Sequence, residues 1–356
     1  MTVRASGGHY SNMLGRDVVL SALTAMGTVT ALSLVMEVPL WLAMLVDSLC
    51  AIIVGSILSA SQDPSKKEDD PGETIGSKEA LRFPLVASGF LVGLYILVKY
   101  LNKDLVNVVL SVYFTFLGIC CLKGYILSIL EKQLKPLLPS FAFKHQFQFP
   151  LVKEPWDCSF DSSDVVCYCL AGAVGLVYFS SKHWVLNNLL GLAFAVYGVE
   201  KISLGSFKIG AIMLGGLFFY DIFWVYGTDV MLTVAKSIDA PIKLLFPKPL
   251  SELTEGGFPF SLLGLGDIIV PGIFLSLAYR FDVFMERKLE KRRRPVYFLA
   301  GLVSYVLGLV ATLVVMKVFN AGQPALLYLV PSTLGFVYGT AVLKGEMKEL
   351  LAYEES

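Results

Sequence analysis

The sequence predicts an all-α fold: a polytopic membrane helix bundle of nine transmembrane helices, with a candidate extra hydrophobic helix at the N-terminus. The chain of 356 residues is 55% hydrophobic and only 16% charged, whereas soluble domains carry about 25% charged residues. Several apolar stretches approach or exceed the roughly 20 residues that span a bilayer as a helix. These stretches are also continuous, whereas the strands of a membrane barrel are short and alternate in polarity.

Nine apolar spans follow one another along the chain. They lie near 38–60, 83–101, 105–130, 165–181, 186–203, 207–227, 258–280, 296–319 and 324–343. A further apolar run over 17–36 exceeds the ~7–15-residue core of a signal peptide, so we expect it to remain as an extra span or an embedded helix. The longest polar stretches, 61–82 and 131–164, are linker-sized. Residues 1–356 are therefore expected to form a single membrane-embedded domain.

Positive charges predict the orientation. The loop after the seventh span carries seven basic residues between Arg280 and Arg294, and short loops rich in Lys and Arg stay in the cytosol. This loop and the C-terminus are then cytosolic, and the 228–257 connection is lumenal. We interpret Arg292–Arg294, and Glu200 with Lys201 at another span end, as topology determinants.

Composition also excludes several functions. The net charge is zero and no basic aromatic patch is present, so no nucleic-acid partner is expected. Six cysteines and three histidines show no CxxC pair or ligand spacing, so no metal and no cofactor are expected.

Two aspartates lie within apolar spans, Asp221 in 207–227 and Asp267 in 258–280. A carboxylate at the centre of a membrane helix costs roughly 2.5–3.5 kcal/mol on insertion scales, so each requires a reason. The side chains one turn from Asp221 are Leu217, Phe218, Trp224 and Val225, none of which can neutralise it. Its partner must come from another helix.

The surroundings of Asp267 predict an irregular backbone. Gly264, Leu265 and Gly266 precede it, and the glycines allow close approach or local unwinding. Pro271 follows four residues later and has no N–H, so the Asp267 carbonyl loses its helical partner. In lipid this is tolerable only if another group or water satisfies the carbonyl.

Two carboxyl groups facing each other across a small wet cleft would share one proton, which is the chemistry of aspartyl hydrolysis. The alternatives are a polar transport pathway and a structural hydrogen-bonded pair. Asp47 also lies inside a span, without a motif around it, and we interpret it as structural.

Three motifs in this order resemble the GxGD-type intramembrane aspartyl proteases. Tyr220-Asp221 lies in one span, Gly264-Leu265-Gly266-Asp267 in the next, and Gln323-Pro324-Ala325-Leu326 at the head of the last. The surrounding segments YDIFWVYGTDVMLTVAKSIDAPIKLLFP, SLLGLGDIIVPGIFLSLAYRFDV and QPALLYLVP resemble the signal peptide peptidase branch. The resemblance covers roughly residues 72–350.

The resemblance implies that Asp221 and Asp267 are catalytic, supported by Tyr220, Gly264, Leu265 and Gly266. It implies that the Pro-Ala-Leu segment, with Gln323, positions the substrate beside them. The substrates would be transmembrane peptides, among them remnant signal peptides and type II or tail-anchored proteins, in the endoplasmic reticulum membrane. Membrane lipids, a homo-oligomer and partners in a degradation complex are further expected contacts.

Two other functions stay open at this stage. A catalytically idle adaptor could bind hydrophobic helices for degradation, although both acids are intact. A presenilin-like protease would carry a long loop where this chain has the short 228–257 connection. The chain also ends LLAYEES, without the dilysine retrieval signal of some relatives.

Overall fold

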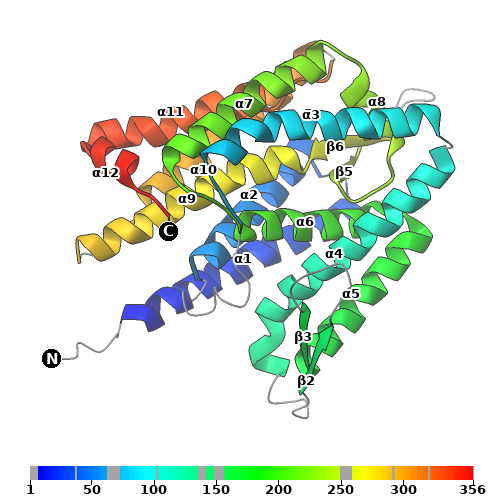
Figure 1. Ribbon diagram of the computed structural model, residues 1–356, viewed down its shortest axis with the longest axis horizontal. Helices are drawn as coiled ribbons and strands as arrows, with labels where there is room; N and C mark the ends of the chain where they lie inside the picture. The colour runs from blue at the N-terminus through cyan, green and yellow to red at the C-terminus, as the bar shows by residue number, and fades with distance from the viewer. Residues whose placement is uncertain are drawn as a thin grey trace.

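The structure is a computed structural model that describes residues 7–36, 38–61, 73–101, 103–134, 142–147, 156–248, 259–290, 293–319 and 321–355. Within these residues, ten long helices form most of the protein (Figure 1). These helices are α1 Gly7–Val35, α2 Leu40–Ser61, α3 Ser77–Tyr100, α4 Lys103–Leu134, α5 Ser162–Ser181, α6 Trp184–Lys201, α7 Phe207–Tyr226, α9 Gly266–Lys288, α10 Val296–Phe319 and α11 Leu326–Lys344. Two short helices, α8 Val230–Ser237 and α12 Met347–Ala352, complete the set.

Each predicted span overlaps a helix, although 258–280 differs at both ends, and the 17–36 run lies in α1 up to Val35. In the described part of the chain, nine helices are long and apolar enough to cross a membrane. That set includes α1 from Asp17 and leaves out α6, whose mean hydropathy is lowered by Asn187, Asn188, Glu200 and Lys201. The predicted membrane helix bundle is confirmed.

The interior of the bundle is formed by α9, which packs against α2, α6, α7, α10 and α11 (Figure 1). Helices α2 and α9 are the most buried of the candidate spans. Val199 of α6 fits between them, because a Cβ added at Gly55 or Gly272 would lie 2.7 or 2.6 Å from its side chain. Small residues at such crossings let helix backbones approach closely.

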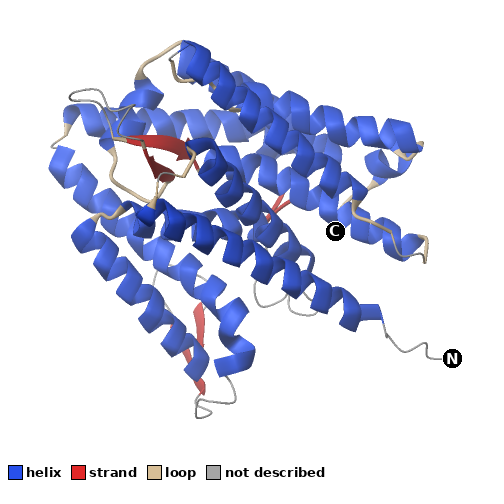
Figure 2. Ribbon diagram, turned by 180° about the vertical axis from the view of Figure 1, so that it is seen from behind, coloured by secondary structure: helices blue, strands red, loops and turns tan. Residues whose placement is uncertain are grey.

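Among the described residues, six short strands form three two-stranded sheets (Figure 2). The strands are β1 Glu73–Ile75, β2 Ala142–Phe147, β3 Trp156–Asp161, β4 Ile202–Leu204, β5 Lys243–Pro247 and β6 Phe260–Gly264. β1 pairs with β4 in parallel, whereas β2 pairs with β3 and β5 pairs with β6 in antiparallel fashion. The β5–β6 register places Lys243 opposite Gly264 and Pro247 opposite Phe260.

The predicted span 258–280 differs from the structure at both ends. Its first part is the strand β6, and the helix α9 begins only at Gly266 and continues to Lys288. A five-residue apolar run reads the same as a strand or as the first turns of a helix. Pairing with β5, the preceding strand in the chain, decides the conformation.

Two asparagines of α6 cover the outer edge of β5. Asn188 donates from Nδ2 to the Leu245 carbonyl at 2.8 Å and accepts the Leu245 N–H at 2.7 Å. Asn187 donates to the Lys243 carbonyl at 2.7 Å. The amide side chains thus replace a third strand, so the buried edge of β5 keeps its hydrogen bonds.

The last residues of the chain connect the ends of α7 and α9. The Tyr353 ring contacts Phe207 of α7 and Phe281 of α9, with centroids 6.2 and 5.3 Å apart. Glu355 forms an ion pair with Arg280 of α9 at 2.5 Å, and its N–H donates to the Gly205 carbonyl at 2.9 Å. The C-terminal segment therefore helps to fix the two helices that carry the aspartates.

Candidate active site

Asp221 is buried on α7, with 2% of its surface exposed. Its Oδ2 atom accepts a hydrogen bond of 2.8 Å from the backbone N–H of Leu326. Leu326 is the first residue of α11, and the first N–H groups of a helix have no partner within that helix. The expectation that the partner of Asp221 comes from another helix is met by the Pro-Ala-Leu segment.

The local backbone explains why the Leu326 N–H is free to bind a carboxylate. Pro324 has no N–H, and its carbonyl accepts from Leu327 N at 3.2 Å. Ala325 accepts from Leu329 N at 3.0 Å and starts the helical hydrogen bonding. The helix therefore begins beside α7 with its positive end toward Asp221, which favours a negative charge there.

Asp267 lies in the first turn of α9, directly after the strand β6. The N–H of Leu265 donates to the Ile242 carbonyl at 3.3 Å, which fixes the turn between strand and helix. A Cβ at Gly264 would lie 3.3 Å from Asp267 Oδ2. Gly264 thus leaves room for the carboxyl group of Asp267, which lies at the N-terminus of its own helix, whereas Asp221 faces the N-terminus of α11.

The two carboxyl groups belong to one site. Helices α7 and α9 pack together, and α11, whose Leu326 N–H binds Asp221, packs against both. Tyr220, next to Asp221 on α7, is partly buried and packs against Trp224 with ring centroids 6.5 Å apart. The structure therefore brings together Tyr220, Asp221 and Asp267.

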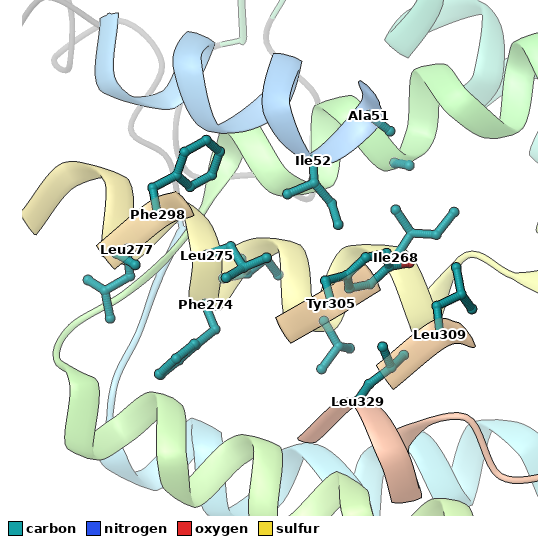
Figure 3. Close-up of a cluster of buried hydrophobic side chains, with 14 of the residues drawn as sticks. Ala51, Ile52, Ile268, Phe274, Leu275, Leu277, Phe298, Tyr305, Leu309 and Leu329 are labelled. Carbon is teal, nitrogen blue, oxygen red and sulfur yellow. The ribbon is translucent and has the colours of Figure 1, made fainter. Parts of the chain in front are cut away.

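The Asp267 carbonyl, which is expected to lack a helical partner, has a hydrogen-bond partner on another helix. Pro271 lies inside α9, and the Asp267 carbonyl accepts a hydrogen bond of 3.3 Å from the Tyr305 hydroxyl of α10. Tyr305 is fully buried and belongs to the hydrophobic cluster around α9, with Ile268 and Leu309 (Figure 3). A tyrosine thus supplies the donor that proline removes.

Gln323 bonds to the end of α7 rather than to an aspartate. Its Oε1 atom accepts a hydrogen bond of 2.5 Å from the Tyr226 hydroxyl, and the Tyr328 hydroxyl lies 3.5 Å from the same atom. Gln323 therefore ties the segment before α11 to the helix that carries Asp221. These contacts, made to tyrosines rather than to a carboxyl group, suit a positioning role.

The hydrogen bonds of the two aspartates described above involve none of the other charged residues that the sequence singled out. Glu200 and Lys201 form an ion pair at 3.9 Å at the end of α6. Arg293 pairs with Glu346 at 2.9 Å, and this contact lowers the pKa of Glu346 although burial opposes it. Asp47 lies on α2, buried, and its structural role stays a prediction.

Sequence reasoning missed Tyr305, Tyr226 and the asparagine pair of α6. Tyr305 lies 38 residues from its partner and Tyr226 lies 97 from Gln323, so no local spacing connects them. Asn187 and Asn188 did leave a readable signal, because two adjacent amides at the start of an apolar span need polar partners.

Comparison with known proteins supports the resemblance to the intramembrane aspartyl proteases. A sequence model described as signal peptide peptidase matches residues 66–356. The chain is 42% identical over 317 residues to the signal peptide peptidases of Mus musculus and Homo sapiens, covering 88% of this chain and 82% and 83% of theirs. It is 39% identical over 264 residues to intramembrane protease 2 of Caenorhabditis elegans, covering 66% of this chain and 56% of that protein.

The matched residues include both aspartates, the β5–β6 hairpin and the Pro-Ala-Leu segment, whereas α1 and α2 precede them. Together with the bundle of membrane-length helices, they mark a multi-pass membrane enzyme that acts on transmembrane peptides. The chain belongs to the signal peptide peptidase family and is an intramembrane aspartic protease.

Proposed function

We propose that Asp221 and Asp267 form the catalytic pair of this protease, and that they hydrolyse peptide bonds of membrane helices with one water molecule. The observation that carries the proposal is their placement. The two acids lie on the packed helices α7 and α9, with Asp221 bound by the first N–H of α11 and Asp267 in the first turn of α9. Two carboxyl groups that act on one water are at close range, where like charges do not both ionise, so we infer that the pair holds one proton.

We assign the roles of the two acids from the hydrogen bond that Asp221 accepts. The Leu326 N–H favours the ionised form of Asp221, so Asp221 takes a proton from the attacking water. Asp267 holds the other proton and donates it toward the oxygen of the scissile carbonyl. The water oxygen bonds to the carbonyl carbon, the C–N bond then breaks, and a carboxyl proton passes to the leaving nitrogen.

The pairing of β5 with β6 supports a second part of the proposal, which concerns how a helical substrate is unwound for cleavage. The bonds from Lys248 N to Pro259 O and from Leu265 N to Ile242 O fix the alternation of the β5–β6 ladder. The N–H and C=O groups of Leu262 and Gly264 then point away from β5. Among the described residues no strand pairs with this outer edge of β6.

We therefore place an extended substrate segment on β6, because β6 leads directly to Asp267. The outer edge of β5 cannot take this role, because Asn187 and Asn188 already occupy it. An added strand gains main-chain hydrogen bonds, and its register is set by side-chain pockets. Gln323, Pro324, Ala325 and Leu326 then hold the opposite side of the substrate beside Asp221.

We infer the substrates from the same chemistry together with the resemblance. They are transmembrane peptides, in particular remnant signal peptides and type II or tail-anchored proteins. The basic loop after α9 supports a cytosolic C-terminus, and we place the protein in the endoplasmic reticulum membrane. A homo-oligomer and partners in a degradation complex stay predictions.

Cleavage by purified protein in liposomes tests this function. A signal-peptide substrate should yield two products, and one oxygen from isotope-labelled water should appear at the new carboxyl terminus. A hydroxyl-bearing peptide isostere should inhibit, because it mimics the tetrahedral geometry. Binding of the substrate without any product would instead favour the idle adaptor, and inactivation by chelators with recovery on adding zinc would overturn the aspartyl chemistry.

A further inference from the structure

A cavity lies away from the aspartate pair, where α1 ends, α2 and α6 begin and β5 ends. Its volume is about 290 Å³, far above the roughly 10–15 Å³ that one water needs. Its lining includes Ser33, Asp47, Trp184, Phe246 and Lys248. Catalysis as described above uses none of these side chains.

Asp47 lines this cavity and has a buried oxygen atom that lacks a hydrogen-bond donor within the described part of the chain. The residue is 3% exposed, and its Oδ1 atom has no hydrogen-bond partner among the residues that the structure describes. A buried acceptor without a partner costs about 1–3 kcal/mol, and more when it is charged. A ligand that brings an N–H donor into the cavity would remove this cost.

The other side chains restrict what such a ligand can be. Lys248 contributes a cation to the lining, and Trp184 contributes an aromatic ring, which attracts an ammonium group. Leu34, Val35 and Met36 line the same cavity and are at least 57% exposed. An acidic group inside, a basic group at β5 and an apolar flank on α1 match a zwitterion attached to hydrocarbon chains.

We propose that this cavity binds the headgroup of a phospholipid that carries a primary ammonium group, as phosphatidylethanolamine does. The ammonium N–H donates to Asp47 Oδ1, the phosphate pairs with Lys248, and the acyl chains follow the exposed apolar end of α1. A choline headgroup lacks an N–H and cannot satisfy Asp47. An anionic headgroup without an ammonium group would pair with Lys248 but leave Asp47 unsatisfied.

Lipid binding to the purified full-length protein in detergent, measured by native mass spectrometry, tests the proposal. The wild-type protein should retain phosphatidylethanolamine at least about tenfold more tightly than phosphatidylcholine of the same chains, because charged hydrogen bonds are worth that much or more. Equal retention of the two lipids would overturn the proposal without any variant.

Variants then locate the site. Asp47→Asn should remove the preference for the ammonium lipid, and Lys248→Gln should weaken retention of both phospholipids. Asp229→Asn, an exposed acid just after α7 and outside the cavity lining, should change neither. If Asp47→Asn does not fold, Lys248→Gln carries the test, because Lys248 lies just after β5 and is only partly buried; unchanged lipid retention in that variant would contradict the proposal.

Discussion

The hydroxyl of Tyr305 donates a hydrogen bond of 3.3 Å to the backbone carbonyl of Asp267. Pro271 denies that carbonyl its usual helical donor. Without Tyr305 the carbonyl would remain unpaired in a buried, lipid-embedded helix. We infer that Tyr305 holds the first turn of α9, and with it the Asp267 carboxyl group, in position for catalysis.

Tyr305→Phe should therefore lower kcat while leaving KM nearly unchanged. The variant keeps the ring but loses the donor, and an unsatisfied buried carbonyl costs about 1–3 kcal/mol. If half of that loss falls on the reacting geometry, kcat drops by roughly threefold to tenfold. Initial rates on a transmembrane peptide in liposomes measure the effect.

Tyr297→Phe on the same helix is the matched control. The Tyr297 hydroxyl donates to Glu346 at 2.8 Å, at the opposite end of α10 from Asp267. This variant should lower the unfolding temperature slightly and leave kcat unchanged. A larger loss of kcat in Tyr297→Phe than in Tyr305→Phe would remove the special role of Tyr305.

Gly264→Ala should reduce activity because the new Cβ would lie 3.3 Å from Asp267 Oδ2. Either the carboxyl group turns away or the strand–helix turn shifts, and both misplace the acid by a few tenths of an ångström. We expect a loss in kcat of about tenfold, since small misplacements at a reacting centre are costly. Gly335→Ala on the exposed face of α11, where a Cβ meets nothing within 4 Å, should leave activity intact.

Pro324→Ala should lower turnover although it removes no acid and no base. Alanine frees the backbone angle that proline fixes and adds an N–H, so Leu326 N is held less firmly against Asp221. The effect should be a severalfold fall in kcat, smaller than for the loss of one charged hydrogen bond, because the Leu326 N–H itself remains. Unchanged kcat in the folded variant would mean that the Pro-Ala-Leu segment does not set the geometry of Asp221.

The outer edge of β6 predicts that the effect of a proline substitution alternates from one residue of the strand to the next. Leu262→Pro removes an N–H that points away from β5, so it should block substrate pairing while the β5–β6 hairpin stays formed. Leu263→Pro removes an N–H that faces β5 and should destabilise the protein. Cleavage by Leu262→Pro at the wild-type rate would exclude strand addition at β6.

Much of this architecture could be predicted because hydropathy reports directly on bilayer spans. The motif order around Asp221, Asp267 and Pro324 indicated the site, and the need for a partner to Asp221 followed from its apolar neighbours. The start of α9 could not be predicted, because Phe260–Gly264 has no local preference that decides between strand and helix. Nor could Tyr305, whose contact depends on how α10 packs against α9.

The most direct measurement of the central claim is cleavage of a transmembrane signal peptide by purified protein in liposomes, with Asp221→Asn and Asp267→Asn assayed separately. Asparagine preserves the size of the side chain but cannot exchange a proton, so each variant should remain folded and lose cleavage by at least about a thousandfold, as expected when general acid–base chemistry is removed. Asp47→Asn, in the separate cavity, should keep most of the wild-type rate. Wild-type-like cleavage by either Asp221→Asn or Asp267→Asn would contradict the account.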